Sequence, residues 1–155
     1  MVASVTHGDA IERRFVEHEH REMAHGLNRI SEVAELAGSL AAPDLTRALR
    51  GLLNWLESTL EPHADWEETW LYPKMDAAAR SGWATRMMRF EHRQIRRMIA
   101  ALEIDLDALR HEPTHAQLVG LRAHLYGLSA LVAAHLEREE QLLLPLLGEE
   151  TSAEH

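Results

Sequence analysis

The feature that most constrains this sequence is an internal repeat, in which one short pattern recurs after 72 residues without a gap. The Glu-His-Arg of residues 19–21 matches that of residues 91–93, and residues 63–73 match residues 135–145 in a His-x3-Glu-Glu pattern that ends in Leu-x-Pro. In each copy the two histidines stand 43 residues apart, with matching leucines between them. The halves therefore share histidine and carboxylate chemistry on a leucine framework. This pattern predicts a duplicated helical hairpin in which both copies contribute to one shared site.

Composition favours a single all-α domain. The 155 residues are long enough to bury a core of their own, aromatic residues make up only 5%, and cysteine is absent. The lack of cysteine excludes disulfides and thiolate-bound metal sites. A net charge of -9 with no basic stripe argues against a nucleic-acid partner. The sequence contains neither a secretory h-region nor an apolar stretch of membrane-spanning length, so we expect a cytoplasmic protein with no membrane partner, as a monomer or weak homo-oligomer.

Helix breakers divide the chain into four long helices joined by short connections. Short connections place neighbouring helices antiparallel, so the sequence predicts an up-down-up-down antiparallel four-helix bundle. Pro73 and Pro145 fall late in the second and fourth helices, where each is expected to kink or end its helix. We expect a flexible N-terminus over residues 1–8, a bundle over 9–148 and a disordered tail over 149–155. The predicted helices cover residues 9–40, 43–79, 83–110 and 114–147.

Six potential metal ligands lie on the apolar stripes of these helices. The stripes repeat in steps of three and four residues and face the bundle interior. A buried carboxylate without a partner costs several kcal/mol, so a positive charge is expected beside such residues. A pair of metal ions meets that requirement, whereas apolar packing alone does not. The candidate ligands are His20, His63, Glu67, His92, His135 and Glu139.

The spacing of these residues suits a metal centre. His63 and Glu67 are four residues apart, as are His135 and Glu139, so each pair lies on one helix face about 6 Å apart. Imidazole with carboxylate is a ligand set for iron, manganese or zinc. Carboxylates from two helices can also bridge a pair of metals.

With these motifs, the sequence resembles the hemerythrin and HHE cation-binding domains over almost its whole length. The resemblance implies a four-helix bundle with an oxo- or hydroxo-bridged non-haem centre of two iron ions, although manganese or zinc is possible. By that similarity, His20 and His63 bind one iron, and His92 and His135 bind the other. Glu67 and Glu139 bridge the two irons, and no catalytic residue separate from the metal centre is implied.

Two positions depart from the oxygen-carrying hemerythrins. Those proteins have a further histidine where this chain has Arg96, and they place the last carboxylate where this chain has Glu140. The internal repeat favours Glu139, because it aligns with Glu67, but Glu140 remains an alternative bridge. Without that histidine, one more coordination position on the metal pair is open, unless Glu68 or Glu140 fills it.

A more open site favours reaction with small oxidants (O2, peroxide or nitric oxide) over reversible oxygen carriage. A catalase-like activity is one such reaction. The alternative is a non-catalytic module that senses iron or oxygen, or only binds metal.

Overall fold

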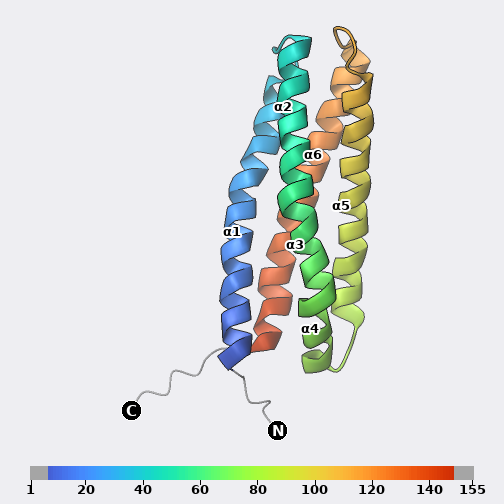
Figure 1. Ribbon diagram of the computed structural model, residues 1–155. Coiled ribbons are helices and arrows are strands. Elements are labelled where there is room, and N and C mark those ends of the chain that lie inside the picture. The colour runs from blue at the N-terminus through green and yellow to red at the C-terminus, as the bar shows by residue number, and fades with distance from the viewer. Residues whose placement is uncertain (1–6, 149–155) are drawn as a thin grey trace.

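The structure is a computed structural model that describes residues 7–148, with side chains placed from Arg13 onward, and the described chain is a helical bundle (Figure 1). The predicted tail and residues 1–6 lie outside the described residues, while residues 7 and 8 already belong to the first helix. None of the described helices is long and apolar enough to cross a membrane. The elements are α1 (His7–Leu36), α2 (Ala42–Trp55), η1 (Leu56–Leu60), α3 (Glu61–Trp66), η2 (Glu67–Leu71), α4 (Tyr72–Ala79), α5 (Trp83–Ala108), α6 (His115–Arg138), η3 (Glu139–Leu143) and η4 (Leu144–Leu147).

The element boundaries follow local sequence signals. Helix α1 ends at Leu36, four residues earlier than predicted, and Pro43 is in the first turn of α2, where its missing N–H costs nothing. Arg80 ends α4 in the left-handed conformation, with φ of 50°. Thr114 caps α6 through reciprocal hydrogen bonds with Gln117. These signals set where each helix begins and ends along the bundle.

Within residues 7–148, three π-helical segments interrupt the helices, and each is followed by a proline. The segments are η1, η2 and η3, and Pro62, Pro73 and Pro145 each lie six residues after the first residue of a segment. Proline lacks an N–H and its ring collides with the carbonyl four residues earlier, so the preceding turn widens. Of the two predicted effects of Pro73, an end of the helix is wrong, because the chain continues through α4, whereas a kink stays a prediction. Pro145 lies in the 3-10 turn η4, which is the last described element.

The core formed by the described side chains is divided into two apolar clusters along the bundle axis. The larger cluster includes Met23, Leu60, Ile95 and Leu136, and it extends toward the α2 end of the bundle. The smaller cluster consists of Val16, Leu71, Tyr72, Met75, Met88, Leu143, Leu144 and Leu147. On α1, α5 and α6–η3, the histidines of the candidate site fall between residues of one cluster and residues of the other. The site therefore has an apolar layer on both sides.

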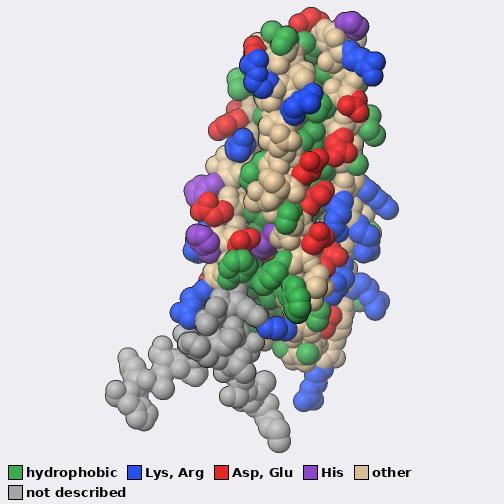
Figure 2. All heavy atoms as spheres, viewed as in Figure 1, with side chains coloured by type: hydrophobic (Ala, Val, Ile, Leu, Met, Phe, Trp, Pro, Cys, Tyr) green, Lys and Arg blue, Asp and Glu red, His purple; other side chains and the backbone are tan. Residues whose placement is uncertain are grey.

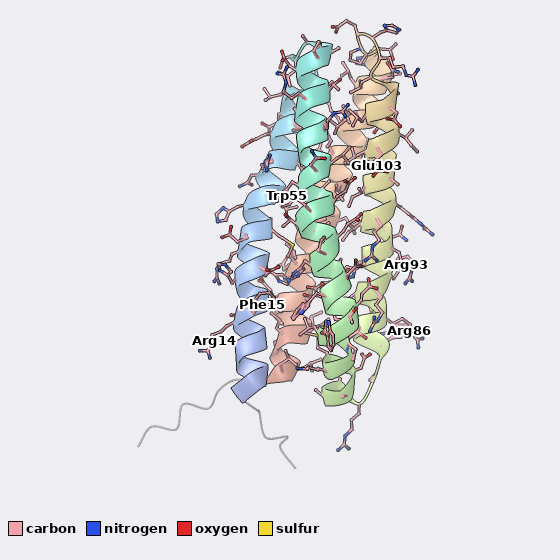
Figure 3. All side chains as sticks on the ribbon, viewed as in Figure 1. Arg14, Phe15, Trp55, Arg86, Arg93 and Glu103 are labelled. Carbon is pink, nitrogen blue, oxygen red and sulfur yellow. The ribbon has the colours of Figure 1, made fainter. Side chains whose placement is uncertain are left out.

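Helices α1 and α2 approach closely at Gly26, against which Trp55 of α2 packs (Figure 3). A Cβ at position 26 would lie 1.9 Å from Cζ2 of Trp55. We expect Gly26→Ala to lower the free energy of unfolding by about 1–3 kcal/mol because the added methyl group overpacks this contact. Urea denaturation of the variant and the wild type would measure the change.

Gly51, within α2, provides the matched control. Nothing lies within 4 Å of a Cβ added at Gly51, so Gly51→Ala should raise the free energy of unfolding by up to about 1 kcal/mol through helix propensity. Equal effects of the two substitutions would contradict the close packing at Gly26.

Candidate metal centre

The structure brings all six predicted ligands together between the two apolar clusters. Their side chains are buried, although four are histidines and two are glutamates. Two of them begin π-helical segments, since Glu67 is the first residue of η2 and Glu139 is the first residue of η3. The others come from α1 (His20), α3 (His63), α5 (His92) and α6 (His135).

The six residues form two groups of four that share both glutamates. The first ligand group is His20, His63, Glu67 and Glu139, and the second ligand group is His92, His135, Glu67 and Glu139. Within each group, one nitrogen or oxygen atom from every residue lies within 4.8 Å of the others. The two histidine pairs are those that the family resemblance implies.

Each glutamate directs one carboxylate oxygen to each group. Oε1 of Glu67 lies 2.5 Å from Nε2 of His63 and 3.3 Å from Nε2 of His20, while its Oε2 lies 3.2 Å from Nε2 of His92. Oε1 of Glu139 lies 3.1 Å from Nε2 of His20, and its Oε2 lies 3.6 Å from Nε2 of His135. This is the arrangement that two carboxylates need in order to bridge a pair of ions.

In each of the four histidines of the ligand groups, Nδ1, the ring nitrogen that faces away from the site, is hydrogen-bonded to a further glutamate. These bonds join Nδ1 of the histidine to a carboxylate on another helix, which fixes the ring and leaves Nε2 directed to the site. The pairs are His63–Glu19 (2.9 Å), His92–Glu68 (2.7 Å), His135–Glu91 (2.9 Å) and His20–Glu140 (3.2 Å).

The sequence left two questions open: whether Glu139 or Glu140 lies among the ligands, and where Arg96 lies. Glu139 is fully buried between the two groups, whereas Glu140 is half-exposed and holds the outer nitrogen of His20. Arg96 directs its guanidinium to Glu68 (3.1 Å) and Asp65 (2.7 Å). Its polar contacts therefore reach the ligands only through the glutamate that holds His92.

The ligand atoms are arranged to bind metal ions rather than to form hydrogen bonds with one another. Among the described residues, Nε2 of His63 and Oε1 of Glu139 are buried and have no hydrogen bond of acceptable geometry. Both nevertheless lie within ion-pair distance of the neighbouring ligands. Buried polar atoms that point at one another without hydrogen bonds are satisfied when a cation lies among them.

The comparison with protein families agrees with this geometry. The family model described as the hemerythrin HHE cation-binding domain matches residues 13–147. This chain belongs to the hemerythrin HHE family. The match includes both glutamates and all four histidines of the ligand groups, whereas no solved structure gives a significant match to the chain.

Tyr72 is a residue of this HHE domain that the sequence analysis missed. It is fully buried, and its hydroxyl donates a hydrogen bond to Oε2 of Glu139 (2.6 Å) and lies 3.2 Å from Oε2 of Glu67. The comparison of the two halves contained one signal, because Tyr72 aligns with Leu144. A polar residue replaces an apolar one next to the shared proline, at a position where the repeat is otherwise close.

The buried charges of the HHE site change the pKa of its members in opposite directions. Burial alone would lower the pKa of His20, but hydrogen bonds to Glu139 and Glu67 outweigh burial and raise it to about 10. Burial would raise the pKa of Glu67, yet its histidine neighbours hold it well below the usual range. Burial and the charge of Glu67 raise the pKa of Glu139. Burial and both carboxylates raise the pKa of Tyr72 well above its usual range.

Metal loading of the HHE domain should release protons. Because the pKa of His20 is about 10, its imidazole carries a proton at neutral pH in protein stripped of metal, and that proton has to leave before Nε2 can bind an ion. The apparent metal affinity should therefore rise as the pH is raised from neutrality toward about 10. Titration calorimetry in buffers with different ionisation enthalpies would measure the released protons. Heats that do not depend on the buffer would contradict this expectation.

Proposed function

We propose that this HHE domain is a non-haem di-iron protein that binds small oxidants and reacts with them. One observation carries the proposal: two four-residue ligand groups share the same two buried glutamates. His20 and His63 would hold one ion, His92 and His135 the other, and Glu67 and Glu139 would bridge them. Imidazole and carboxylate ligands suit iron, and manganese or zinc are the alternatives that the same ligands accept.

The surroundings of the site support binding of a small molecule rather than a large one. A cavity of about 20 Å³, room for about one water molecule, adjoins the ligands and is lined by His63, His92, His135 and Arg96. Its apolar walls come from residues such as Met23 and Val132. A bound pair of iron ions would supply electrons and binding positions for O2, peroxide or nitric oxide. The protein supplies a small, mostly apolar space beside the ligands.

Charge balance gives a further argument for two ions. Both shared carboxylates are buried, and a buried carboxylate requires compensation by positive charge. The outer glutamates Glu19, Glu68, Glu91 and Glu140 increase the negative charge around the four imidazoles. Divalent or trivalent ions at both groups would compensate this charge.

Metal content and reaction with peroxide test the proposal together. Protein from iron-supplemented medium should contain about two irons per chain, one for each ligand group, and should show charge-transfer absorption that changes on addition of peroxide. Evolution of O2 from peroxide would establish a catalase-like reaction. Iron binding without turnover would favour the iron- or oxygen-sensing alternative. Stably folded protein that takes up no metal would contradict the proposal.

We also infer that residues 9–148 form one domain with the up-down-up-down topology of a duplicated hairpin. Short connections support this arrangement: residues 37–41, 80–82 and 109–114 join the long helical segments at opposite ends of the bundle (Figure 1). Helix α6 packs extensively against both α1 and α5. On the face drawn in Figure 2, acidic and basic side chains are intermixed along the bundle, which fits a partner that is a small molecule and not a nucleic acid.

A further inference from the structure

The hydroxyl of Tyr72 lies against three of the four residues of the second ligand group. It is 2.6 Å from Oε2 of Glu139, 3.2 Å from Oε2 of Glu67 and 3.3 Å from Nε2 of His92. The atoms it approaches on both glutamates are the oxygens directed to the second group. The phenol oxygen is therefore placed as a further member of that group and has no counterpart in the first.

These distances match the separations of ligands around one ion. Two ligands at right angles, each about 2.1 Å from an ion, lie about 3.0 Å apart. The Nε2 atoms of His92 and His135 are 3.0 Å apart, and Nε2 of His92 is 3.2 Å from Oε2 of Glu67. The contacts of Tyr72 fall in the same range. The phenol oxygen is therefore at the distance from Glu67, Glu139 and His92 that is expected of a further ligand to the same ion.

The π-helical segment η2 explains why Tyr72 reaches the site. In a regular α-helix, residues five apart differ by about 140° around the axis and face different directions. In η2 the N–H of Tyr72 bonds to the carbonyl of Glu67, five residues earlier, so the two side chains share a face. The segment η3 makes the same bond between Leu144 and Glu139, but Leu144 offers no ligand atom.

The other residues beside the second group either cannot bind an ion or are engaged elsewhere. Arg96 stands where oxygen carriers have a further histidine, and its guanidinium binds Asp65 and Glu68. Glu68 holds Nδ1 of His92 on the outer side of the ring. Tyr72 is the remaining described side chain with a polar atom against the ligand oxygens.

We propose that the phenol oxygen of Tyr72 is a fifth protein ligand of the metal position held by His92 and His135. The proposal rests on the di-iron function proposed above. Coordination as a phenolate displaces the phenol proton, which leaves to the solvent. The two metal positions then differ, because the second has one protein ligand more than the first.

Spectroscopy of the oxidised, iron-loaded protein tests the assignment. The chain contains two tyrosines, and the other one, Tyr126, is exposed on α6, so Tyr126→Phe is the matched control. The wild type and Tyr126→Phe should show resonance-enhanced phenolate ring vibrations with excitation in a visible charge-transfer band. Tyr72→Phe should lose these vibrations, and its iron content is measured on the same sample.

The outcomes separate this proposal from the di-iron function. Iron-loaded wild type without phenolate vibrations, or their persistence in Tyr72→Phe, would overturn the role of Tyr72 and leave the di-iron function standing. Wild type that binds no iron would overturn both. Should Tyr72→Phe fail to fold, the wild type and Tyr126→Phe still decide, because phenolate vibrations in Tyr126→Phe can come only from Tyr72.

Discussion

Replacing Glu67 with glutamine should cause the loss of both metal ions at once. Glu67 directs one oxygen to each ligand group, and the amide of glutamine offers a single acceptor oxygen, so it cannot bridge. The variant should lose affinity at both positions by more than the roughly 10- to 100-fold expected when only an outer hydrogen-bond partner is removed. Iron content after dialysis against a chelator and the visible spectrum would measure the loss.

The neighbouring residue provides the control. Glu68→Gln makes the same change one position along η2, but among the six ligands Glu68 contacts only the outer nitrogen of His92, and glutamine can still accept that hydrogen bond. The other partner of Glu68, Arg96, is not a ligand. The control should retain both ions, with affinity reduced at the second position only, toward the lower end of the roughly 10- to 100-fold range. Equal metal loss in the two variants would contradict a bridging role for Glu67. Circular dichroism of the stripped proteins verifies that both are folded.

Metal loading should raise the melting temperature of the bundle strongly. An ion that binds only the folded state contributes about 4 kcal/mol at a thousandfold excess over its Kd. For a chain of this size that corresponds to a rise of roughly 8–16 °C for each occupied position. Thermal melts followed by circular dichroism, with and without added ferrous iron under anaerobic conditions, would measure the shift.

A histidine outside the site tests whether this stabilisation is specific. His124 is hydrogen-bonded to Asp105 (2.5 Å) and belongs to neither ligand group, so His124→Ala should keep the full metal-dependent shift. His135→Ala removes a ligand of the second group and should lose about half of it. A similar shift in both variants would show that the ions bind elsewhere.

The repeat allowed much of the site to be predicted from sequence, because it turned isolated histidines into a pattern. A single core histidine is compatible with many roles, but His20 and His92 share one register, and so do His63 and His135. The family that this pattern indicated is confirmed by the match over residues 13–147, and the helical bundle is confirmed in outline. The role of the six residues as ligands stays a prediction.

Tyr72 and the π-helical segments could not be predicted in the same way. A comparison of the two halves reveals only the residues that they share, and Tyr72 aligns with a leucine, Leu144, in the other half. A π-helical segment shifts the helix register by one residue over a single turn, which leaves the apolar periodicity on both sides readable as one α-helix. The prolines are the available signal, because Pro62, Pro73 and Pro145 each lie two residues after the last residue of a π-helical segment, but a proline indicates a helix end or a kink as readily as a π-helical turn.

The four bonds between histidines and outer glutamates form a closed ring around the bundle. Glu19–His63 and Glu91–His135 each lie within one half of the chain, whereas Glu68–His92 and Glu140–His20 join the halves. Exchange of the two halves converts Glu19–His63 into Glu91–His135. It likewise converts Glu68–His92 into Glu140–His20. This is the rule of an isologous interface, in which residue i of one copy contacts residue j of its partner and the reverse contact also exists. Two separate copies of one hairpin, related by a two-fold axis, would make the same four bonds, so nothing in this ring requires the halves to share a chain.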